Sequence, residues 1–312
     1  MGLPSVLVTG AAGFVGSSLI RSLAAAGHQV VALYRNRQPV SGEKVYPTCS
    51  DLRSVELLLT PLRGIDIVIH LAWNNPFSSS EGSYPISANE EAFSHLVQAC
   101  EKTGVRRVVL LSAFGSDKKS TSKFLQEKYQ CEGILLNSEI GEKVILRSSI
   151  IYGMGNDHDR YLKALFSLFR YPIIYPAAFS QWQVAPMKLH DIVSILQDFC
   201  RSEPIGRNLI FRDIVGTRPL AYEEVLRTIA KSGNFGHRIP LKGRLGRTYL
   251  QFLERKGAGK GFLPKMSQFL EIPCYPSSES NEFYNRHDIS IDDGQGGNFL
   301  KYLGDQRKGN SL

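Results

Sequence analysis

Short apolar segments alternate with amphipathic segments along the first half of the chain. The apolar segments predict strands at residues 6–8, 29–33, 44–47, 65–72 and 108–111, and a sixth strand with its exit loop at 145–153. Helix-compatible segments lie at 14–26, 52–62 and 87–103. Segments that are apolar at nearly every position, such as 65–72, are typical of strands buried on both faces of a sheet. The alternation predicts an α/β fold with a doubly wound parallel sheet and right-handed crossovers.

A glycine-rich turn, Thr9 to Gly16, joins the first strand to the first helix. Gly10 allows a tight turn that a Cβ atom would obstruct, Gly13 allows the backbone to approach a ligand, and Gly16 allows the helix to pack closely on the strand. Amide groups at the start of a helix lack intrahelical acceptors and bind anions readily. The turn therefore predicts a site for the pyrophosphate of a dinucleotide rather than a structural turn without a ligand. The predicted contacts are Gly10, Ala12, Gly13, Phe14, Val15 and Gly16.

The end of the second strand indicates which dinucleotide to expect. A carboxylate at this place accepts hydrogen bonds from the 2′-hydroxyl of NAD, but the chain has no acidic residue there before Glu43 and carries Arg35 and Arg37 instead. Guanidinium groups suit a 2′-phosphate, so NADP(H) is favoured over NAD(H), unless both arginines simply face water. Asp51 can cap the helix predicted at 52–62, accept a hydrogen bond from the adenine amino group, or do both.

The hydrophobic pattern weakens after Gly153. We expect residues 1–153 to form a dinucleotide-binding domain, and residues 154–312 to form a smaller substrate lobe that is interleaved with the core sheet. In this second part the pattern predicts helices at 159–170, 222–231 and 245–255, a helix capped by His190 and Asp191 that ends at Cys200, a strand at 207–212, a polar loop at 276–298 and a mobile tail from residue 306.

Composition argues against several other classes of protein. With 312 residues, 43% of them hydrophobic, the chain can bury a full core, and no apolar segment is long enough to span a membrane. The chain starts directly with a strand and shows no secretory signal, so we expect a cytoplasmic protein. The five cysteines form no C-x-x-C pair, which argues against a disulfide framework or a metal site. The net charge of +8 suits phosphate-bearing ligands better than nucleic acid, because the basic segment 231–265 has few interleaved aromatic residues.

Several short motifs occur in an order that is typical of one family. They are Thr9-Gly10-x-x-Gly13-x-x-Gly16, Asp51-Leu52, His70-Leu71-Ala72, Asn89, Ser112, Ser122-Lys123-x-x-x-Glu127 and Leu146-Arg147-x-x-x-x-Tyr152-Gly153. Over residues 4–193 the chain resembles the extended short-chain dehydrogenase/reductases, and more narrowly the NAD-dependent epimerase/dehydratase family. The resemblance implies a Rossmann fold in which Asp51 contacts adenine, Ala72 lines the nicotinamide ribose and Lys123 holds the ribose hydroxyls. It also assigns Leu52, Leu71, Ser148 and Ile151 to the cofactor site.

The catalytic positions depart from those of the family that the chain resembles. In that family, the lysine that corresponds to Lys123 lowers the pKa of a tyrosine four residues earlier. The tyrosine takes a proton from a sugar hydroxyl while hydride leaves for the nicotinamide. Lys119 occupies the tyrosine position here, and Ser112 lies where a hydroxyl polarises the substrate. We expect catalytic roles for Ser112, Lys119 and Lys123.

Three interpretations of Lys119 stay open. In the first, the protein binds a dinucleotide without redox chemistry and serves as a sensor or scaffold. In the second, Lys119 itself is the base, because neighbouring lysines lower its pKa. In the third interpretation another tyrosine, Tyr84 or Tyr152, reaches the site. The resemblance implies an NAD(P)-dependent oxidoreductase that acts on a nucleotide sugar or a related polar metabolite, and a homodimer is a further expectation. The alternative is a non-catalytic NADP(H)-binding sensor or scaffold of the same fold.

Overall fold

The computed structural model describes most of the first half of the chain and parts of the second. It covers residues 2–73, 88–120, 122–153, 174–177, 183–201 and 208–216, with shorter pieces at 203, 219–221, 223–225, 227–228, 239–242, 244–245, 248–249 and 252. The helix predicted at 159–170, the loop at 276–298 and the tail from 306 lie outside the described residues. Short helical pieces at 223–225, 227–228, 245, 248–249 and 252 fall within two further predicted helices, and residue 244 directly precedes the second of them.

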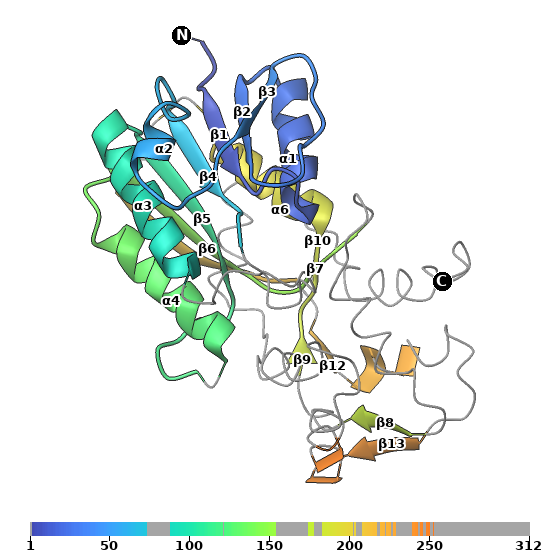
Figure 1. Cartoon of the computed structure of the whole chain (residues 1–312). Helices are drawn as coiled ribbons and strands as arrows, with labels where there is room; N and C mark the ends of the chain where they lie inside the picture. The colour runs from blue at the N-terminus through green and yellow to red at the C-terminus, as the bar shows by residue number, and fades with distance from the viewer. Residues whose placement is uncertain are drawn as a thin grey trace.

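Seven parallel strands form the central sheet, in the order β11-β6-β5-β4-β1-β2-β3 (Figure 1). The strands are β1 (Val6–Thr9), β2 (Val30–Tyr34), β3 (Val45–Cys49), β4 (Ile67–His70), β5 (Arg107–Ala113), β6 (Glu142–Ser148) and β11 (Leu209–Ile214). From β1 the chain proceeds outward through β2 and β3 in one direction, and through β4, β5 and β6 in the other. The predicted doubly wound parallel sheet is therefore confirmed, and its order reverses between β1 and β4, the place where such sheets bind ligands.

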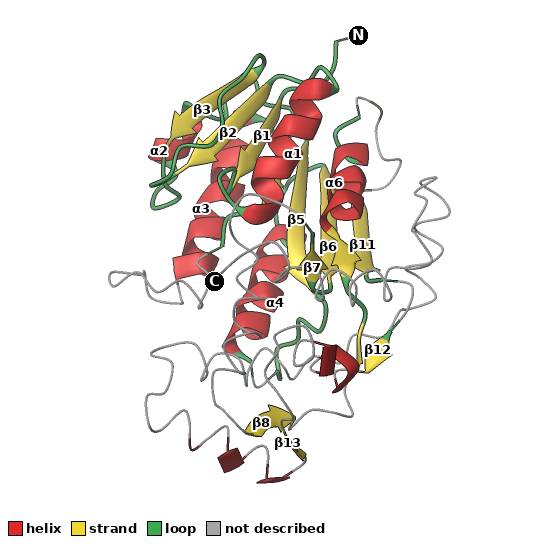
Figure 2. Cartoon of the chain, turned by 90° about the vertical axis from the view of Figure 1, so that its right-hand side faces the viewer, coloured by secondary structure: helices red, strands yellow, loops and turns green. Residues whose placement is uncertain are grey.

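Helices cover both faces of this sheet (Figure 2). On one face, α1 (Phe14–Ala25) and α6 (Leu189–Asp198) share a core with Val6 and Val8 of β1. On the other face, α2 (Glu56–Leu59), α3 (Ala88–Thr103) and α4 (Lys123–Leu136) share a second core with Leu7. Alternate side chains of β1 thus enter opposite cores, because successive residues of a strand point to opposite faces.

The chain returns to the main sheet after Gly153. The helix α6 packs against α1, and β11 pairs with β6 to extend the sheet. Three short pairings lie beyond the sheet: β7 (Ile151–Tyr152) with β10 (Met187–Lys188), β9 (Gln183–Val184) with β12 (Leu220–Ala221), and β8 (Ile174–Ala177) with β13 (Ile239–Lys242). The division of the chain at Gly153 stays a prediction.

Arg107 connects the segment after α6 to the amino edge of the sheet by hydrogen bonds. Its side chain is completely buried at the start of β5. Its Nε donates to the Glu142 carboxylate over 2.8 Å, and its Nη atoms donate to the carbonyl oxygens of Phe199 (2.6 Å), Arg201 (3.1 Å) and Glu203 (2.8 Å). The carbonyls at the end of α6, which lack partners within the helix, therefore gain a buried cationic donor.

Two predicted helix starts are wrong. The helix expected at 52–62 is limited to Glu56–Leu59, and Asp51 does not cap it. The Asp51 carboxylate instead accepts hydrogen bonds from the backbone amide of Arg53, over 3.0 Å, and from the Arg53 side chain. Aspartate commonly folds back on the backbone in this way, in competition with a helix. Similarly, His190 and Asp191 lie inside the first turn of α6 because extended backbone continues to Lys188, which occupies the cap position.

Candidate functional site

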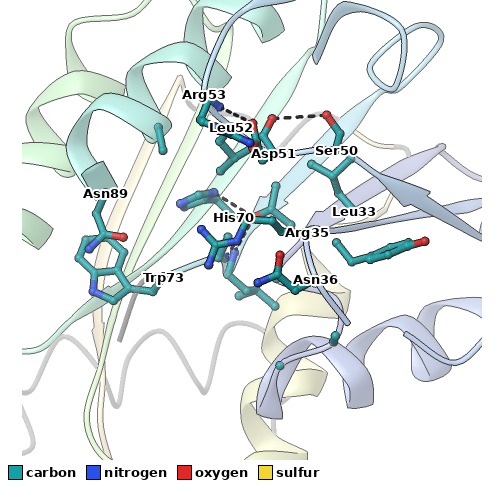
Figure 3. Close-up of a pocket in the computed structure, with 18 of the residues that line it drawn as sticks. Leu33, Arg35, Asn36, Ser50, Asp51, Leu52, Arg53, His70, Trp73 and Asn89 are labelled. Carbon is teal, nitrogen blue, oxygen red and sulfur yellow. Dashed lines mark hydrogen bonds and ion pairs between the residues drawn. The ribbon is translucent and has the colours of Figure 1, made fainter. Parts of the chain in front are cut away.

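A cavity of about 530 Å³ opens at the carboxyl edge of the sheet, beside the switch point between β1 and β4 (Figure 3). Its volume is within the range of sites for small molecules and cofactors. The turns that follow β1, β2, β3 and β4 line it, together with the first turns of α3. Nine predicted cofactor residues line the cavity: Gly10, Ala12, Gly13, Arg35, Arg37, Asp51, Leu52, Leu71 and Ala72. Phe14, Val15, Gly16, Lys123, Ser148 and Ile151 are not among its lining residues.

The glycine turn has the close packing that its sequence predicts. Gly10 adopts a φ of +67°, and a Cβ atom there would lie 2.7 Å from the amide nitrogen of Ala72. A Cβ atom at Gly16 would lie 2.2 Å from the carbonyl oxygen of Gly10. Gly13 occupies the cap position of α1, so the first amides of that helix begin at the wall of the cavity. This cradle has the chemistry that a pyrophosphate requires.

Thr9 and His70 join the ends of β1 and β4 beneath the cavity. The Thr9 Oγ1 accepts hydrogen bonds from the backbone amides of Leu71 and Ala72, each over 3.2 Å. Its hydroxyl proton is therefore available for the Nδ1 atom of His70, which lies 2.9 Å away. Burial lowers the pKa of His70 to about 3, so the ring is neutral and carries its proton on Nε2. This network holds the backbone that Gly10 packs against.

Three guanidinium groups and one carboxylate lie at the end of the cavity formed by the β2 and β3 turns. Arg35 and Arg37 follow β2, while Asp51 and Arg53 follow β3, and Figure 3 shows Arg53 paired with Asp51. Arg53 was not expected here, because it was assigned to a helix. This end of the cavity therefore offers more cationic than anionic side chains.

The α3 helix supplies a wall of the cavity at which no cofactor contact was predicted. Asn89 and His95 line the cavity, with Glu91 and Ala92 between them. The Nδ1 atom of His95 donates to the Leu52 carbonyl over 3.1 Å, since a carbonyl oxygen only accepts. Asn89 donates over 3.0 Å to Glu127, a buried residue of α4 whose carboxyl pKa is raised by burial. The spacing of a helix brings these polar side chains of α3 to one face. In the sequence, such a polar face looks the same whether it lines a cavity or faces water.

The predicted catalytic residues do not line the cavity. Ser112 is only 3% exposed, and its hydroxyl donates over 2.5 Å to the Glu132 carboxylate, which is also paired with Arg147 over 2.6 Å. Lys119 and Lys123 are both exposed near the start of α4. The structure therefore keeps Ser112 in a buried network and places the two lysines elsewhere, on the surface.

Tyr152, one of the two tyrosines considered as a replacement base, is buried, and Tyr84 lies outside the described residues. Among the described residues, no cluster of His, Cys, Asp and Glu is arranged to hold a metal ion. No helix in the described part of the chain is long and apolar enough to cross a membrane.

Residues 10–183, more than half of the chain, match the model of the NAD(P)H-binding family. The chain belongs to this family. The match begins at the glycine turn and covers every strand of the main sheet from β2 to β6, so the family assignment and the geometry of the cavity agree.

Two curated relatives are reductases. The dTDP-4-dehydro-6-deoxy-D-allose reductase of a Streptomyces species is 28% identical over 193 residues, which are 50% of this chain and 58% of the relative. The ceramide reductase of Caulobacter vibrioides is 27% identical over 205 residues, which are 64% of this chain and 62% of the relative. The chain thus spans less than two thirds of the length of these relatives.

Two solved structures of proteins that differ from this chain in most residues share its fold. The UDP-N-acetylglucosamine 4-epimerase from Methanobrevibacter ruminantium is 17% identical, covers 99% of this chain and 98% of its own, and has a TM-score of 0.67. MoeE5, solved with UDP-glucuronic acid and NAD, is 26% identical, with a TM-score of 0.60 over 78% of this chain and 87% of its own. The fold that the resemblance to the epimerase/dehydratase family implies is confirmed.

Proposed function

We propose that the protein binds NADP(H) in the cavity and is an oxidoreductase that acts on a nucleotide sugar or a related polar metabolite. The observation that carries the proposal is the glycine cradle at the wall of a cavity of about 530 Å³ whose far end holds three guanidinium groups. The bound nicotinamide supplies or accepts the hydride. The chain's own residues hold the cofactor: the amides of α1 the pyrophosphate, Arg35 and Arg37 the 2′-phosphate, and Asp51 the adenine amino group.

Direct titration tests the choice of cofactor. We expect NADPH to bind more tightly than NADH, and the variants Arg35→Gln and Arg37→Gln to weaken NADPH binding by roughly ten-fold each, with little effect on NADH, because charged hydrogen bonds to the 2′-phosphate are lost. Arg63→Gln is the matched control, since Arg63 is exposed and is not among the lining residues of the cavity. Equal affinities of the native protein for NADPH and NADH would refute the preference.

The substrate class rests on relatives and on the family resemblance. One relative is a dTDP-sugar reductase, and one similar structure holds UDP-glucuronic acid. The test is the change in nicotinamide absorbance with dTDP-, UDP- and GDP-sugars. Lys119→Met is expected to abolish turnover if the amine of Lys119 transfers the proton, whereas Lys119→Tyr, which restores the residue of the family, is expected to retain or raise it.

A second candidate function is cofactor binding without catalysis. Two observations favour it: Lys119 stands exposed at the position of the family's tyrosine, and the Ser112 hydroxyl is already committed to Glu132. For this candidate, NADPH raises the melting temperature of the protein, because a ligand that binds only the native state stabilises it, yet the absorbance stays constant with every substrate offered. Turnover with any nucleotide sugar would exclude it.

A further inference from the structure

Lys128 is a buried cation that none of the predicted roles uses. It lies on the inner face of α4 and is 7% exposed. Its Nζ atom donates over 2.9 Å to the carbonyl oxygen of Leu111 in β5, and lies 3.7 Å from the centre of the Trp73 ring and 5.9 Å from that of Phe124. A cation over the face of an aromatic ring is attracted by the ring quadrupole, which offsets part of the cost of burial.

Trp73 connects this cation to the cavity. It follows Ala72 at the end of β4 and lines the cavity, where Figure 3 shows it beside Asn89. Its ring packs edge-on against Phe124, with the ring centres 5.8 Å apart, so it is held from two sides. The Nε1 atom of Trp73 is buried and has no hydrogen-bond partner among the described residues. The cavity and the ammonium group are therefore in contact with the same indole ring.

The acids around Lys128 compensate its charge only in part: burial lowers the pKa of Lys128, and the nearby carboxylates of Glu132 and Glu127 raise it to a smaller extent. In the described part of the chain, no carboxylate forms an ion pair with its ammonium group. On α4, Glu132 is bound to Arg147 and Ser112, Glu127 is bound to Asn89, and burial raises the pKa of Cys131 to about 12, which keeps that thiol neutral. From β4 the ammonium faces neutral His70, and from α3 Glu90 acts on the neighbouring Glu127.

We propose that Lys128 determines which redox state of the cofactor the protein prefers, by disfavouring the positively charged nicotinamide ring of NADP⁺ relative to the neutral ring of NADPH. The inference rests on the proposed function, in which Ala72 lines the nicotinamide ribose and Trp73 is the next residue along the wall. The two redox states share every phosphate and differ by one positive charge on the ring. The phosphate contacts cancel in the comparison, and the effect of a nearby fixed charge remains.

The expected effect is measurable. Two unit charges roughly 10 Å apart, at an effective dielectric constant of about 20, change the ratio of two binding constants by on the order of ten-fold. Burial lowers the pKa of Lys128 to about 8, so the side chain is mostly protonated at pH 7. We therefore expect the native protein to bind NADPH roughly ten-fold more tightly than NADP⁺ at pH 7.

The test compares dissociation constants for NADPH and NADP⁺, measured by calorimetry at pH 7. Lys128→Met is expected to bring the ratio of the two constants to within about two-fold, because it removes the charge and keeps an apolar side chain against Trp73. Lys143→Met is the matched control: the Lys143 ammonium likewise donates to a backbone carbonyl, that of Leu136 over 3.1 Å, but near the start of β6, at the opposite edge of the sheet from the cavity. For the Lys143→Met variant, the ratio of the dissociation constants for NADPH and NADP⁺ is expected to equal that of the native protein.

An unchanged ratio in a folded Lys128→Met variant would overturn the inference. If that variant does not fold, the native protein supplies the test, since its preference for NADPH must fade as pH rises through about 8 and Lys128 loses its proton. This pKa sets the range to measure, roughly pH 6.5 to 9.5, and a ratio of the two dissociation constants that stays constant over that range also overturns the inference. Failure to bind either cofactor would instead overturn the proposed function, so the two failures are distinguishable.

Discussion

Replacement of Arg107 by methionine is expected to destabilise the protein strongly without touching the cavity. The guanidinium group is completely buried and uses its donors on Glu142 and on the carbonyls of Phe199, Arg201 and Glu203. Methionine fills part of the volume but donates no hydrogen bond. The segment that includes α6 therefore loses its polar attachment to the amino edge of the sheet.

The magnitude follows from the partners left behind. Removing one member of a buried ion pair costs about 3–5 kcal/mol when the remaining charge is unpaired, but Glu142 keeps its contact with Arg106 over 2.7 Å. The buried carbonyl of Phe199 loses its donor, at a cost of about 1–3 kcal/mol, whereas the exposed residues Arg201 and Glu203 can be rehydrated. We expect a loss of about 3 kcal/mol in the free energy of unfolding.

Chemical denaturation measures this loss, and thermal unfolding should show a fall of about 5–10 °C in melting temperature. Arg106→Met is the matched control, because it removes a contact to the same carboxylate from a side chain that is 34% exposed. Screening by water limits its effect to about 1 kcal/mol or less. Equal losses in the two variants, or a loss below about 1 kcal/mol for Arg107→Met, would refute the reasoning.

Two further variants test the cradle and the network beneath it. Gly16→Ala places a Cβ atom 2.2 Å from the Gly10 carbonyl oxygen, so it should lower the free energy of unfolding by about 3 kcal/mol and abolish NADPH binding. Gly133→Ala is the control: it lies in open space within α4 and should raise the free energy of unfolding by about 0.5–1 kcal/mol in the same denaturation assay. His70 has a pKa of about 3 in the folded protein against about 6.5 when unfolded, so the unfolded state binds more protons between these values. The stability that neutral His70 contributes is present above pH 6.5 and is lost as pH falls toward 3. The variant His70→Asn should therefore flatten the fall in the free energy of unfolding between pH 6 and 4, by up to about 1.4 kcal/mol per pH unit. An unchanged slope would count against this reasoning.

Much of the fold and of the cofactor end of the site is predictable from the sequence, because both depend on local patterns. Apolar runs separated by amphipathic segments specify strands and crossover helices. Parallel strands then bring their carboxyl ends to one edge. Gly10, Arg35 and Ala72 follow different strands and meet at the cavity for this reason. The predicted helix starts were wrong at two places: at Asp51, where the side chain bonds to the backbone of Arg53, and at His190, where extended backbone continues to Lys188.

Only the tertiary structure decided which polar side chains are buried. Lys128 and Arg107 look in the sequence like ordinary surface cations. Their burial depends on α4 packing against β5 and on α6 returning to the sheet. The same packing committed the hydroxyl of Ser112 to Glu132. A pattern of neighbours along the chain specifies which elements form and at which edge a ligand binds. Desolvation and partner choice depend on residues that are distant in sequence, so the charges around Trp73 at the wall of the cavity are a property of the folded chain alone.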